Sequence, residues 1–113
     1  MASHALDRHI VLVGFMGAGK STYGVQLAAR IGRRFVDIDR EIERHGDSIA
    51  KIFERDGEAA FRTREVDELR DALAVGERLV VALGGGAVET ADVRHLLQTA
   101  FVVWLEEIGR AHV

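Results

Sequence analysis

The stretch HIVLVGFMGAGKST, residues 9–22, runs from a short apolar segment through a glycine-rich loop into polar residues. The apolar segment 9–13 is rich in β-branched residues and ends at a glycine, which is typical of a buried strand. The loop from Gly14 to Ser21 matches the pattern G-x-x-x-x-G-K-S/T at every defined position. Glycines let backbone N–H groups turn toward phosphate oxygens, and the helix that follows directs its positive end at the same anion. The stretch therefore predicts a strand, a phosphate-binding loop and a helix in succession.

The loop also predicts which residues contact a nucleoside triphosphate. Lys20 is expected to reach the β- and γ-phosphates of ATP, and the Ser21 hydroxyl is suited to the Mg²⁺ that accompanies the nucleotide. No other metal is expected, because the 5 histidines show no ligand spacing among themselves. The residues expected to contact ATP are Gly14, Gly17, Ala18, Gly19, Lys20, Ser21 and Thr22.

Two other interpretations of the loop are weaker. Gly14, Gly17 and Gly19, with Asp39 lying 20 residues beyond the last glycine, resemble a variant dinucleotide-binding turn. Such a site gains nothing from Lys-Ser-Thr directly after the glycines, and the third glycine is not at the usual spacing. A glycine-rich turn without function is the other alternative. We favour the nucleoside-triphosphate loop over both.

Apolar spacing and turn residues divide the rest of the chain into alternating strands and helices. Helices are expected over residues 20–31, 39–45, 49–56, 58–75 and 90–99, and strands over 9–13, 33–39, 78–86 and 100–106. Strands that alternate with helices imply a parallel sheet covered on both faces. The expected fold class is therefore α/β, in one domain.

The composition bounds the function classes that are possible. The chain has 113 residues, enough for one small domain, and its formal net charge of −3 gives no reason to expect nucleic acid or an anionic membrane as partner. It contains no cysteine, which excludes disulfides and thiolate metal sites. No apolar run approaches the roughly 20 residues of a membrane span, and the first residues lack the layout of a signal peptide. We expect a cytoplasmic monomer.

Four segments carry a resemblance to a known family. They are GFMGAGKST (14–22), DIDREIE (37–43), IFERDGEAAFRTRE (52–65) and LGGGAV (83–88). Their order and spacing resemble those of shikimate kinase, from about residue 9 to residue 106. The resemblance implies a P-loop fold like that of the nucleoside monophosphate kinases. It also implies transfer of the ATP γ-phosphoryl group to the 3-hydroxyl of shikimate, a step toward chorismate and the aromatic amino acids.

The same resemblance implies roles for residues outside the loop. In the family, the aspartate at the position of Asp37 helps to hold Mg²⁺. Asp39 resembles the group that contacts shikimate hydroxyls and could accept the proton of the attacking one. Arg62 resembles the arginine that grips the shikimate carboxylate, and Glu65 could steady it. The glycines expected to contact shikimate are Gly84, Gly85 and Gly86.

Each of these residues also has a purely structural alternative. The two aspartates could serve only to cap the following helix. Arg62 and Glu65 could be a solvated surface pair, and the three glycines a flexible turn. Phe53 and Phe61 could line the pocket or belong to the core.

The chain departs from the family near its C-terminal end. Family members continue with a fifth strand, an arginine-bearing lid, a second shikimate-binding arginine and adenine contacts. We therefore expect residues 1–107 to be a partial shikimate kinase domain that lacks the last strand and the lid. Residues 108–113, IGRAHV, can be encoded by a nucleotide string that resembles a common sequencing-library adapter. We expect a non-native tail there, with a natural short paralogue as the alternative.

Two further functions remain open at this stage. A gluconate kinase-like enzyme shares the loop and the general fold, and its acceptor is also a polyhydroxy carboxylate. From a different class, the chain could be a nucleotide-binding remnant without catalysis, because lids exclude water and complete the charge-stabilising set.

Overall fold

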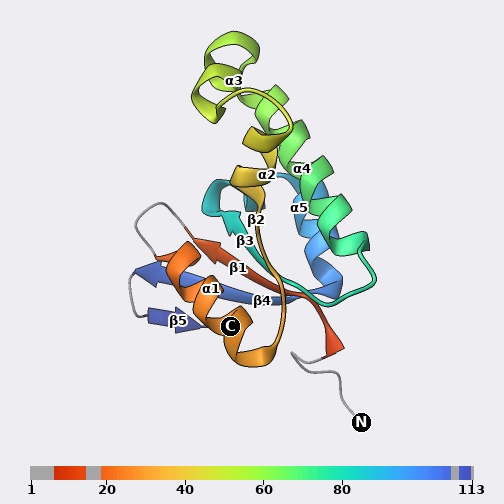
Figure 1. Cartoon of the computed structure of the whole chain (residues 1–113). Coiled ribbons are helices and arrows are strands. Elements are labelled where there is room, and N and C mark those ends of the chain that lie inside the picture. Colours follow the sequence, from red (N-terminus) through yellow and green to blue (C-terminus); the bar gives the residue numbers. More distant parts are fainter. Residues whose placement is uncertain (1–6, 15–18, 108–109, 113) are drawn as a thin grey trace.

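The computed structural model describes residues 7–14, 19–107 and 110–112, and they form a mixed sheet with helices on both faces (Figure 1). The strand order is β2-β3-β1-β4-β5. The strands are β1 (Ile10–Gly14), β2 (Phe35–Asp37), β3 (Val80–Gly84), β4 (Phe101–Glu107) and β5 (Arg110–His112). The helices are α1 (Lys20–Ile31), α2 (Ile38–Arg44), α3 (Ile49–Asp56), α4 (Glu58–Ala74) and α5 (Ala91–Leu96), with short 3₁₀ turns η2 (Gly85–Glu89) and η3 (Leu97–Thr99).

The central strand β1 brings the carboxyl ends of its neighbours to one edge of the sheet. It pairs in parallel with β3 on one side and with β4 on the other. Gly14 at the end of β1 is in register with Gly84 at the end of β3, and Asp37 at the end of β2 is in register with Ala82. The carboxyl ends of these three strands therefore lie beside one another. In α/β sheets this edge is where ligands bind.

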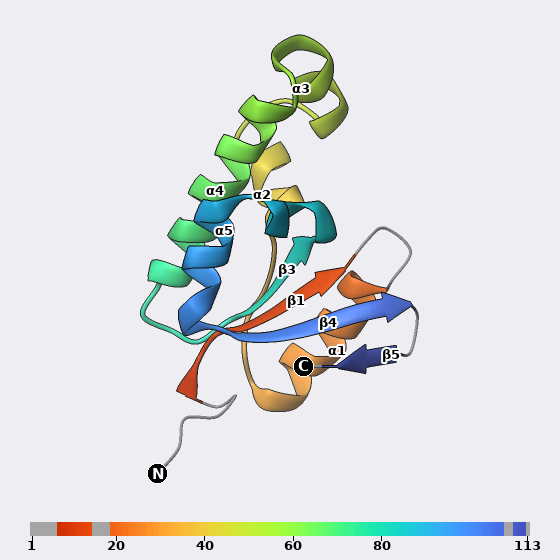
Figure 2. The same ribbon diagram turned by 180° about the vertical axis from the view of Figure 1, so that it is seen from behind.

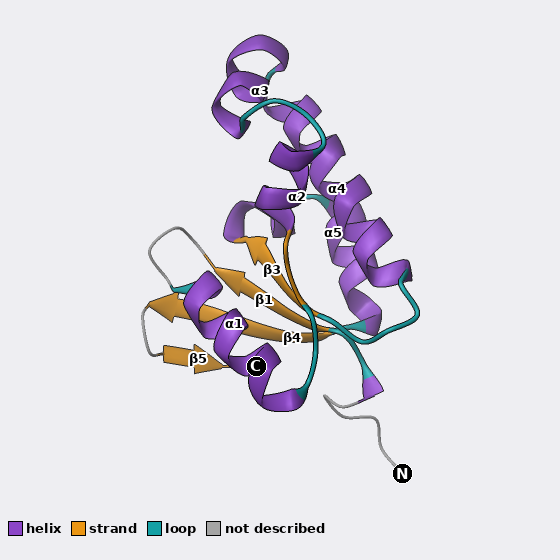
Figure 3. Ribbon diagram, viewed as in Figure 1, coloured by secondary structure: helices purple, strands orange, loops and turns teal. Residues whose placement is uncertain are grey.

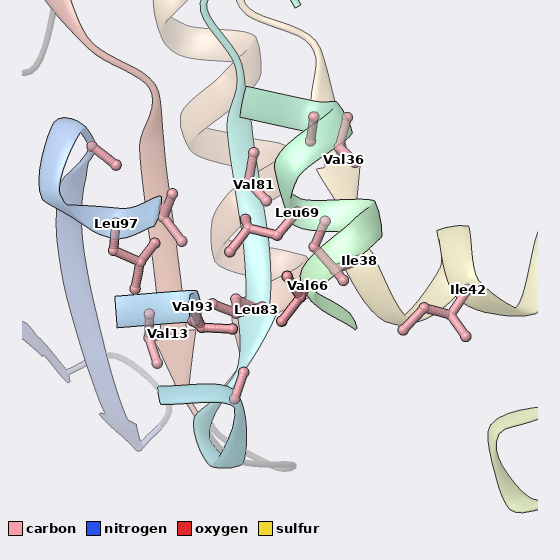
Figure 4. Close-up of a cluster of buried hydrophobic side chains, with 14 of the residues drawn as sticks. Val13, Val36, Ile38, Ile42, Val66, Leu69, Val81, Leu83, Val93 and Leu97 are labelled. Carbon is pink, nitrogen blue, oxygen red and sulfur yellow. The ribbon is translucent and has the colours of Figure 1, made fainter. Parts of the chain in front are cut away.

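Alternating side chains of β1 supply two separate hydrophobic layers. Val11 and Val13 belong to the larger cluster, which Figure 4 shows between the sheet and α4 and α5. Ile10 and Leu12 point the other way, into a smaller cluster with Ala28 of α1. Figures 1 and 2 show α1 on one face of the sheet and α4 and α5 on the other. Burial of β1 on both faces explains its unbroken apolar sequence.

A three-helix unit extends beyond the carboxyl edge of the sheet (Figure 3). It consists of α2, α3 and the start of α4, with α3 farthest from the strands. Ser48 caps α3 by accepting a hydrogen bond from the Lys51 N–H at 3.3 Å. The rings of Phe53 and Phe61 pack together with centroids 4.8 Å apart, which holds α3 against α4. Helices α2 and α4 of this unit contribute residues to the cavity at the carboxyl ends of the strands.

A buried histidine lies at the opposite edge, just before β1. His9 Nδ1 accepts a hydrogen bond from the Leu79 N–H at 3.0 Å. Its Nε2 has no hydrogen-bond partner among the described residues. Burial, with help from the charges of Arg78 and Arg33, lowers the pKa of His9. The imidazole is therefore held neutral, with its proton on Nε2, because Nδ1 acts as the acceptor.

The fold confirms the α/β class and the four parallel strands, with differences at the boundaries. The strand expected over 33–39 ends at Asp37, because the Asp37 carboxylate accepts from the Asp39 and Arg40 N–H groups and starts α2. The strand expected to reach residue 86 ends at Gly84, where η2 begins. The helix expected over 90–99 divides into α5 and η3.

The sheet is not wholly parallel, contrary to the sequence-based expectation. Strand β5 runs antiparallel to β4 and pairs residue 112 with Trp104. The edge of β4 offers backbone N–H and C=O groups, and the chain that follows it pairs with them. In the described part of the chain, no helix combines the length and the apolar character that crossing a membrane requires.

Candidate active site

A cavity of about 530 Å³ opens at the carboxyl ends of β1, β2 and β3. Its walls come from the start of α1, the β2–α2 junction, the inner face of α4 and the β3–η2 turn. It is lined by Gly14, Gly19, Lys20, Ser21, Thr22, Asp37, Asp39, Phe61, Arg62, Glu65, Ala82, Gly84, Gly85 and Gly86. Every candidate site residue within the described part of the chain is therefore in one cavity, whereas Gly17 and Ala18 lie outside the described residues.

The N-terminus of α1 forms one wall of the cavity. Helix α1 starts at Lys20, directly after Gly19, whose φ of 81° lies in the left-handed region that glycine adopts without strain. Gly19 has no side chain to cap the helix, so within the described residues no side-chain cap occupies the first N–H groups of α1, and an anion can bind them. The positive end of the helix dipole and the Lys20 side chain add to the attraction. This wall can bind phosphate groups.

Ser21 and Asp37 connect α1 to the end of β2. The Ser21 hydroxyl donates to Asp37 Oδ2 at 3.2 Å. The other carboxylate oxygen accepts from the N–H groups of Asp39 at 3.0 Å and Arg40 at 3.4 Å. Asp37 therefore caps α2 and also faces the hydroxyl that the loop motif assigns to Mg²⁺. A hydroxyl and a carboxylate oxygen side by side are hard oxygen ligands, and these residues fit that cation.

Asp39 lies in the first turn of α2 and not at the end of a strand. Its carboxyl group is partly buried in the cavity wall. Burial raises the pKa of Asp39, the charges of Asp37 and Glu43 raise it further, and those of Lys20 and Arg62 oppose the rise. A carboxylate with a raised pKa is a stronger proton acceptor. Asp39 is thus a candidate proton acceptor that lies near the positive charges of Lys20 and Arg62.

Arg62 is held in place by two glutamates on its own helix. Its guanidinium donates to Glu65 Oε1 at 2.8 Å and, more weakly, to Glu58 Oε2 at 3.4 Å. Glu65 is 1% exposed, and burial raises the pKa of its carboxyl group while Arg62 opposes the rise. The Arg62 guanidinium also lies 5.2 Å from the centroid of the Phe61 ring. The pair is thus no solvated surface pair.

Of the three glycines at the end of β3, Gly86 lies closest to Arg62. A Cβ added at Gly86 would lie 2.7 Å from the Arg62 guanidinium, whereas one at Gly84 would make an ordinary 3.9 Å contact with Glu65. Gly85 is buried at the start of η2. In this structure the third glycine therefore lies next to the Arg62 side chain.

The structure also decides which of the two phenylalanines lines the cavity, and it adds one residue, Glu58, that sequence reasoning missed. Phe61 is buried and lines the cavity, whereas Phe53 is 40% exposed, is not among the lining residues and packs against the Phe61 ring. Glu58 was not foreseen as a partner of Arg62. Its position four residues before Arg62 on an expected helix was the available signal.

The fold and the phosphate-binding wall define the class. A parallel sheet whose central strand leads through a G-x-x-x-x-G-K-S loop into a helix is that of a P-loop nucleoside-triphosphate-binding protein. The sequence model of the shikimate kinase family matches residues 16–108. The chain belongs to the shikimate kinase family.

Individual relatives agree with this assignment. The chain is 48% identical over 100 residues to a shikimate kinase of Symbiobacterium thermophilum, a match that covers 87% of the chain and 57% of the relative. It is 54% identical over 97 residues to a shikimate kinase of Streptomyces coelicolor, covering 85% of the chain and 56% of the relative. The chain thus spans little more than half the length of these curated relatives.

Solved structures show the same similarity. Shikimate kinase from Acinetobacter baumannii, in complex with shikimate, superposes with a TM-score of 0.82 at 48% identity, over 87% of this chain and 55% of that one. A gluconokinase from Sinorhizobium meliloti superposes with a TM-score of 0.53 at 19% identity. The second likeness is one of fold alone.

Proposed function

We propose that the protein transfers the γ-phosphoryl group of ATP to the 3-hydroxyl of shikimate. The observation that carries this proposal is that one cavity joins the N-terminus of α1, Asp39 and Arg62. Family membership and the Acinetobacter baumannii relative, whose structure holds shikimate, support the choice of acceptor. Because the chain spans little more than half of its relatives, the proposal concerns the activity of the whole protein.

The α1 wall would bind the nucleotide. The N–H groups that follow Gly19 and the ammonium of Lys20 would contact the β- and γ-phosphates, with Gly14, Gly17, Ala18 and Thr22 completing the loop. Ser21 and Asp37 would hold Mg²⁺, which neutralises phosphate charge when it is bound. The 3.2 Å contact between the Ser21 and Asp37 side chains supports their joint assignment.

The opposite wall would bind the acceptor. Arg62 would bind the shikimate carboxylate through paired hydrogen bonds, which fix the orientation of the ring as well as its charge. The backbone of Gly84, Gly85 and Gly86 would contact the ring from the β3 side. Asp39 would orient the 3-hydroxyl and accept its proton as the new O–P bond forms, and its raised pKa suits that role.

The proposal is tested by measuring ADP release with shikimate and with gluconate as alternative acceptors. We expect turnover with shikimate and little with gluconate, and the reverse would favour the gluconate kinase-like alternative. Tight ADP binding without turnover on either acceptor, in the full-length protein, would indicate a nucleotide-binding remnant. The Arg62→Ala variant should lose shikimate use and keep ATP binding. An unchanged dependence on shikimate in that variant would contradict the carboxylate assignment.

We further propose that residues 1–107 are part of a longer shikimate kinase domain and that 108–113 are foreign to it. The adapter-like coding of IGRAHV supports this boundary, and the family match ends one residue beyond it, at residue 108. Sequencing the native locus outward from the Trp104 codon tests it, and a locus that encodes the same tail would contradict it. The monomeric state and the cytoplasmic location remain predictions.

A further inference from the structure

A second group of metal-binding side chains lies where α2 meets α4. Glu41 lies in α2 and His45 directly after it, one helical turn along, and Glu68 faces them from α4. Each of the three offers one ligand atom, and these atoms all lie within 4.8 Å of one another. We propose that Glu41, His45 and Glu68 bind one divalent transition-metal ion of the Zn²⁺ type.

The contact between His45 and Glu68 already joins the two helices. His45 Nδ1 lies 2.7 Å from Glu68 Oε2, so one shared proton connects the imidazole to the carboxylate. The Glu68 side chain is only 17% exposed, which limits its freedom to turn away. One oxygen of Glu41 accepts from Arg44 at 2.8 Å, which leaves the other oxygen for a metal.

The surroundings of the three side chains favour a cation. A cavity of about 160 Å³ is lined by all three and also by Asp71 and Arg34. The Arg34 guanidinium is paired with Glu77 at 2.9 Å, so it does not balance the carboxylates of the cavity. Arg44 is paired with Glu41, so Glu68 and Asp71 are the carboxylates of the cavity that have no arginine partner among the described residues, and they line it together with one imidazole. The cavity also has room for the water molecules that would complete the coordination of an ion held by three protein ligands.

The donor set indicates which ions would bind. One imidazole nitrogen and two carboxylate oxygens suit Zn²⁺, Co²⁺ or Ni²⁺, whereas Ca²⁺ and Mg²⁺ prefer oxygen ligands only. Bonds of about 2.0 to 2.2 Å place ligand atoms roughly 3 to 4 Å apart, which small side-chain rotations would achieve here. The metal takes the lone pair of the imidazole nitrogen, and any proton there passes to solvent. Binding should therefore weaken as the pH falls.

The histidines alone do not show this site. Its signal in the sequence is the spacing of Glu41 and His45 on one helix, but Glu68 lies 23 residues beyond His45 and is brought to them by packing of α2 on α4. A bound ion would tie α2, which carries Asp39, to α4, which carries Arg62. The inference does not depend on the proposed kinase activity.

Zinc titration by calorimetry tests the site on the unmodified chain and on three variants. We expect one equivalent of Zn²⁺ to bind, with affinity reduced at least about tenfold in His45→Ala and Glu68→Gln. The control variant His95→Ala removes an exposed histidine of α5 and should bind as the unmodified chain does. Zn²⁺ at about ten times its dissociation constant should also raise the melting temperature by roughly 5 °C, and this rise should vanish in the two site variants.

Two results would overturn the inference. One is the absence of Zn²⁺ binding to the unmodified chain. The other is equal binding by the unmodified chain, His45→Ala and Glu68→Gln, which would place the ion elsewhere, for example at Ser21 and Asp37. Should His45→Ala fail to fold, Glu68→Gln decides the matter, because glutamine keeps the hydrogen bond to the imidazole but is a poor metal ligand.

Discussion

Removal of the Arg62 side chain should leave a buried, unpaired charge in the candidate active site. Glu65 is 1% exposed, and its Oε1 accepts from the Arg62 guanidinium at 2.8 Å. In Arg62→Ala the Glu65 carboxylate would lose this partner. The double variant Arg62→Ala/Glu65→Gln removes the charge as well, so the difference between the two variants measures the cost of the unpaired carboxylate.

The burial of Glu65 sets the expected loss of stability in Arg62→Ala. Breaking a buried ion pair by removing one partner costs about 3 to 5 kcal/mol. Glu65 is fully buried and the Arg62 side chain is 23% exposed, so we expect Arg62→Ala to lower the free energy of unfolding by about 3 kcal/mol at neutral pH. The double variant should recover about 2 kcal/mol of this, because an uncharged amide is cheaper to bury. The control Arg70→Ala breaks an exposed pair with Asp67 and should cost at most about 1 kcal/mol.

Urea denaturation followed by circular dichroism, at pH 7 and at pH 5, measures these differences. Burial already raises the pKa of Glu65, and loss of Arg62 should raise it more. The folded variant then binds more protons than the unfolded chain, so its stability decreases as the pH rises through the folded pKa. The loss caused by Arg62→Ala should therefore be larger at pH 7 than at pH 5. Equal losses at both pH values, or a double variant no more stable than the single one, would refute the reasoning.

Three further predictions concern the site and the opposite edge of the sheet. In the full-length protein, Lys20→Ala and Asp39→Asn should each abolish ADP release while thermal melting stays similar, and normal turnover in either would contradict its assigned role. Gly86→Ala places a Cβ 2.7 Å from the Arg62 guanidinium, so the KM for shikimate should rise several-fold with the KM for ATP unchanged; equal changes in both would indicate a general disturbance. Burial lowers the pKa of His9. Below about pH 6.5 the unfolded chain therefore binds more protons than the folded protein, and the free energy of unfolding should decrease as the pH is lowered. In His9→Asn this part of the decline should be absent, and a slope like that of the unmodified chain would mean that other groups cause it.

Local sequence was sufficient to predict those elements whose signal lies within a few neighbouring residues. The apolar run before Gly14 and the loop motif predicted β1, the phosphate-binding loop and the start of α1, because each depends on local backbone preferences and hydrophobic periodicity. The resemblance carried by four short segments added Asp39 and Arg62 as acceptor-binding candidates. Asp39, Arg62 and the described residues of the loop motif lie in one cavity.

Other features depend on contacts between distant residues. The cap that Asp37 makes on α2 is local and was among the sequence-based alternatives, whereas the hydrogen bond that Asp37 accepts from Ser21 joins residues 16 positions apart. The antiparallel pairing of β5 depends on the edge that β4 presents, which no local pattern encodes.

The sequence by itself determined the α/β class, the phosphate-binding loop and the residues that resemble those of shikimate kinase. Only the tertiary structure decided that Glu65 is buried beside Arg62 and that Gly86 lies close to the guanidinium. It alone brought Glu68 to Glu41 and His45. The physical reason is that burial raises the energy of an unpaired charge, and burial is a property of the packed sheet and helices together.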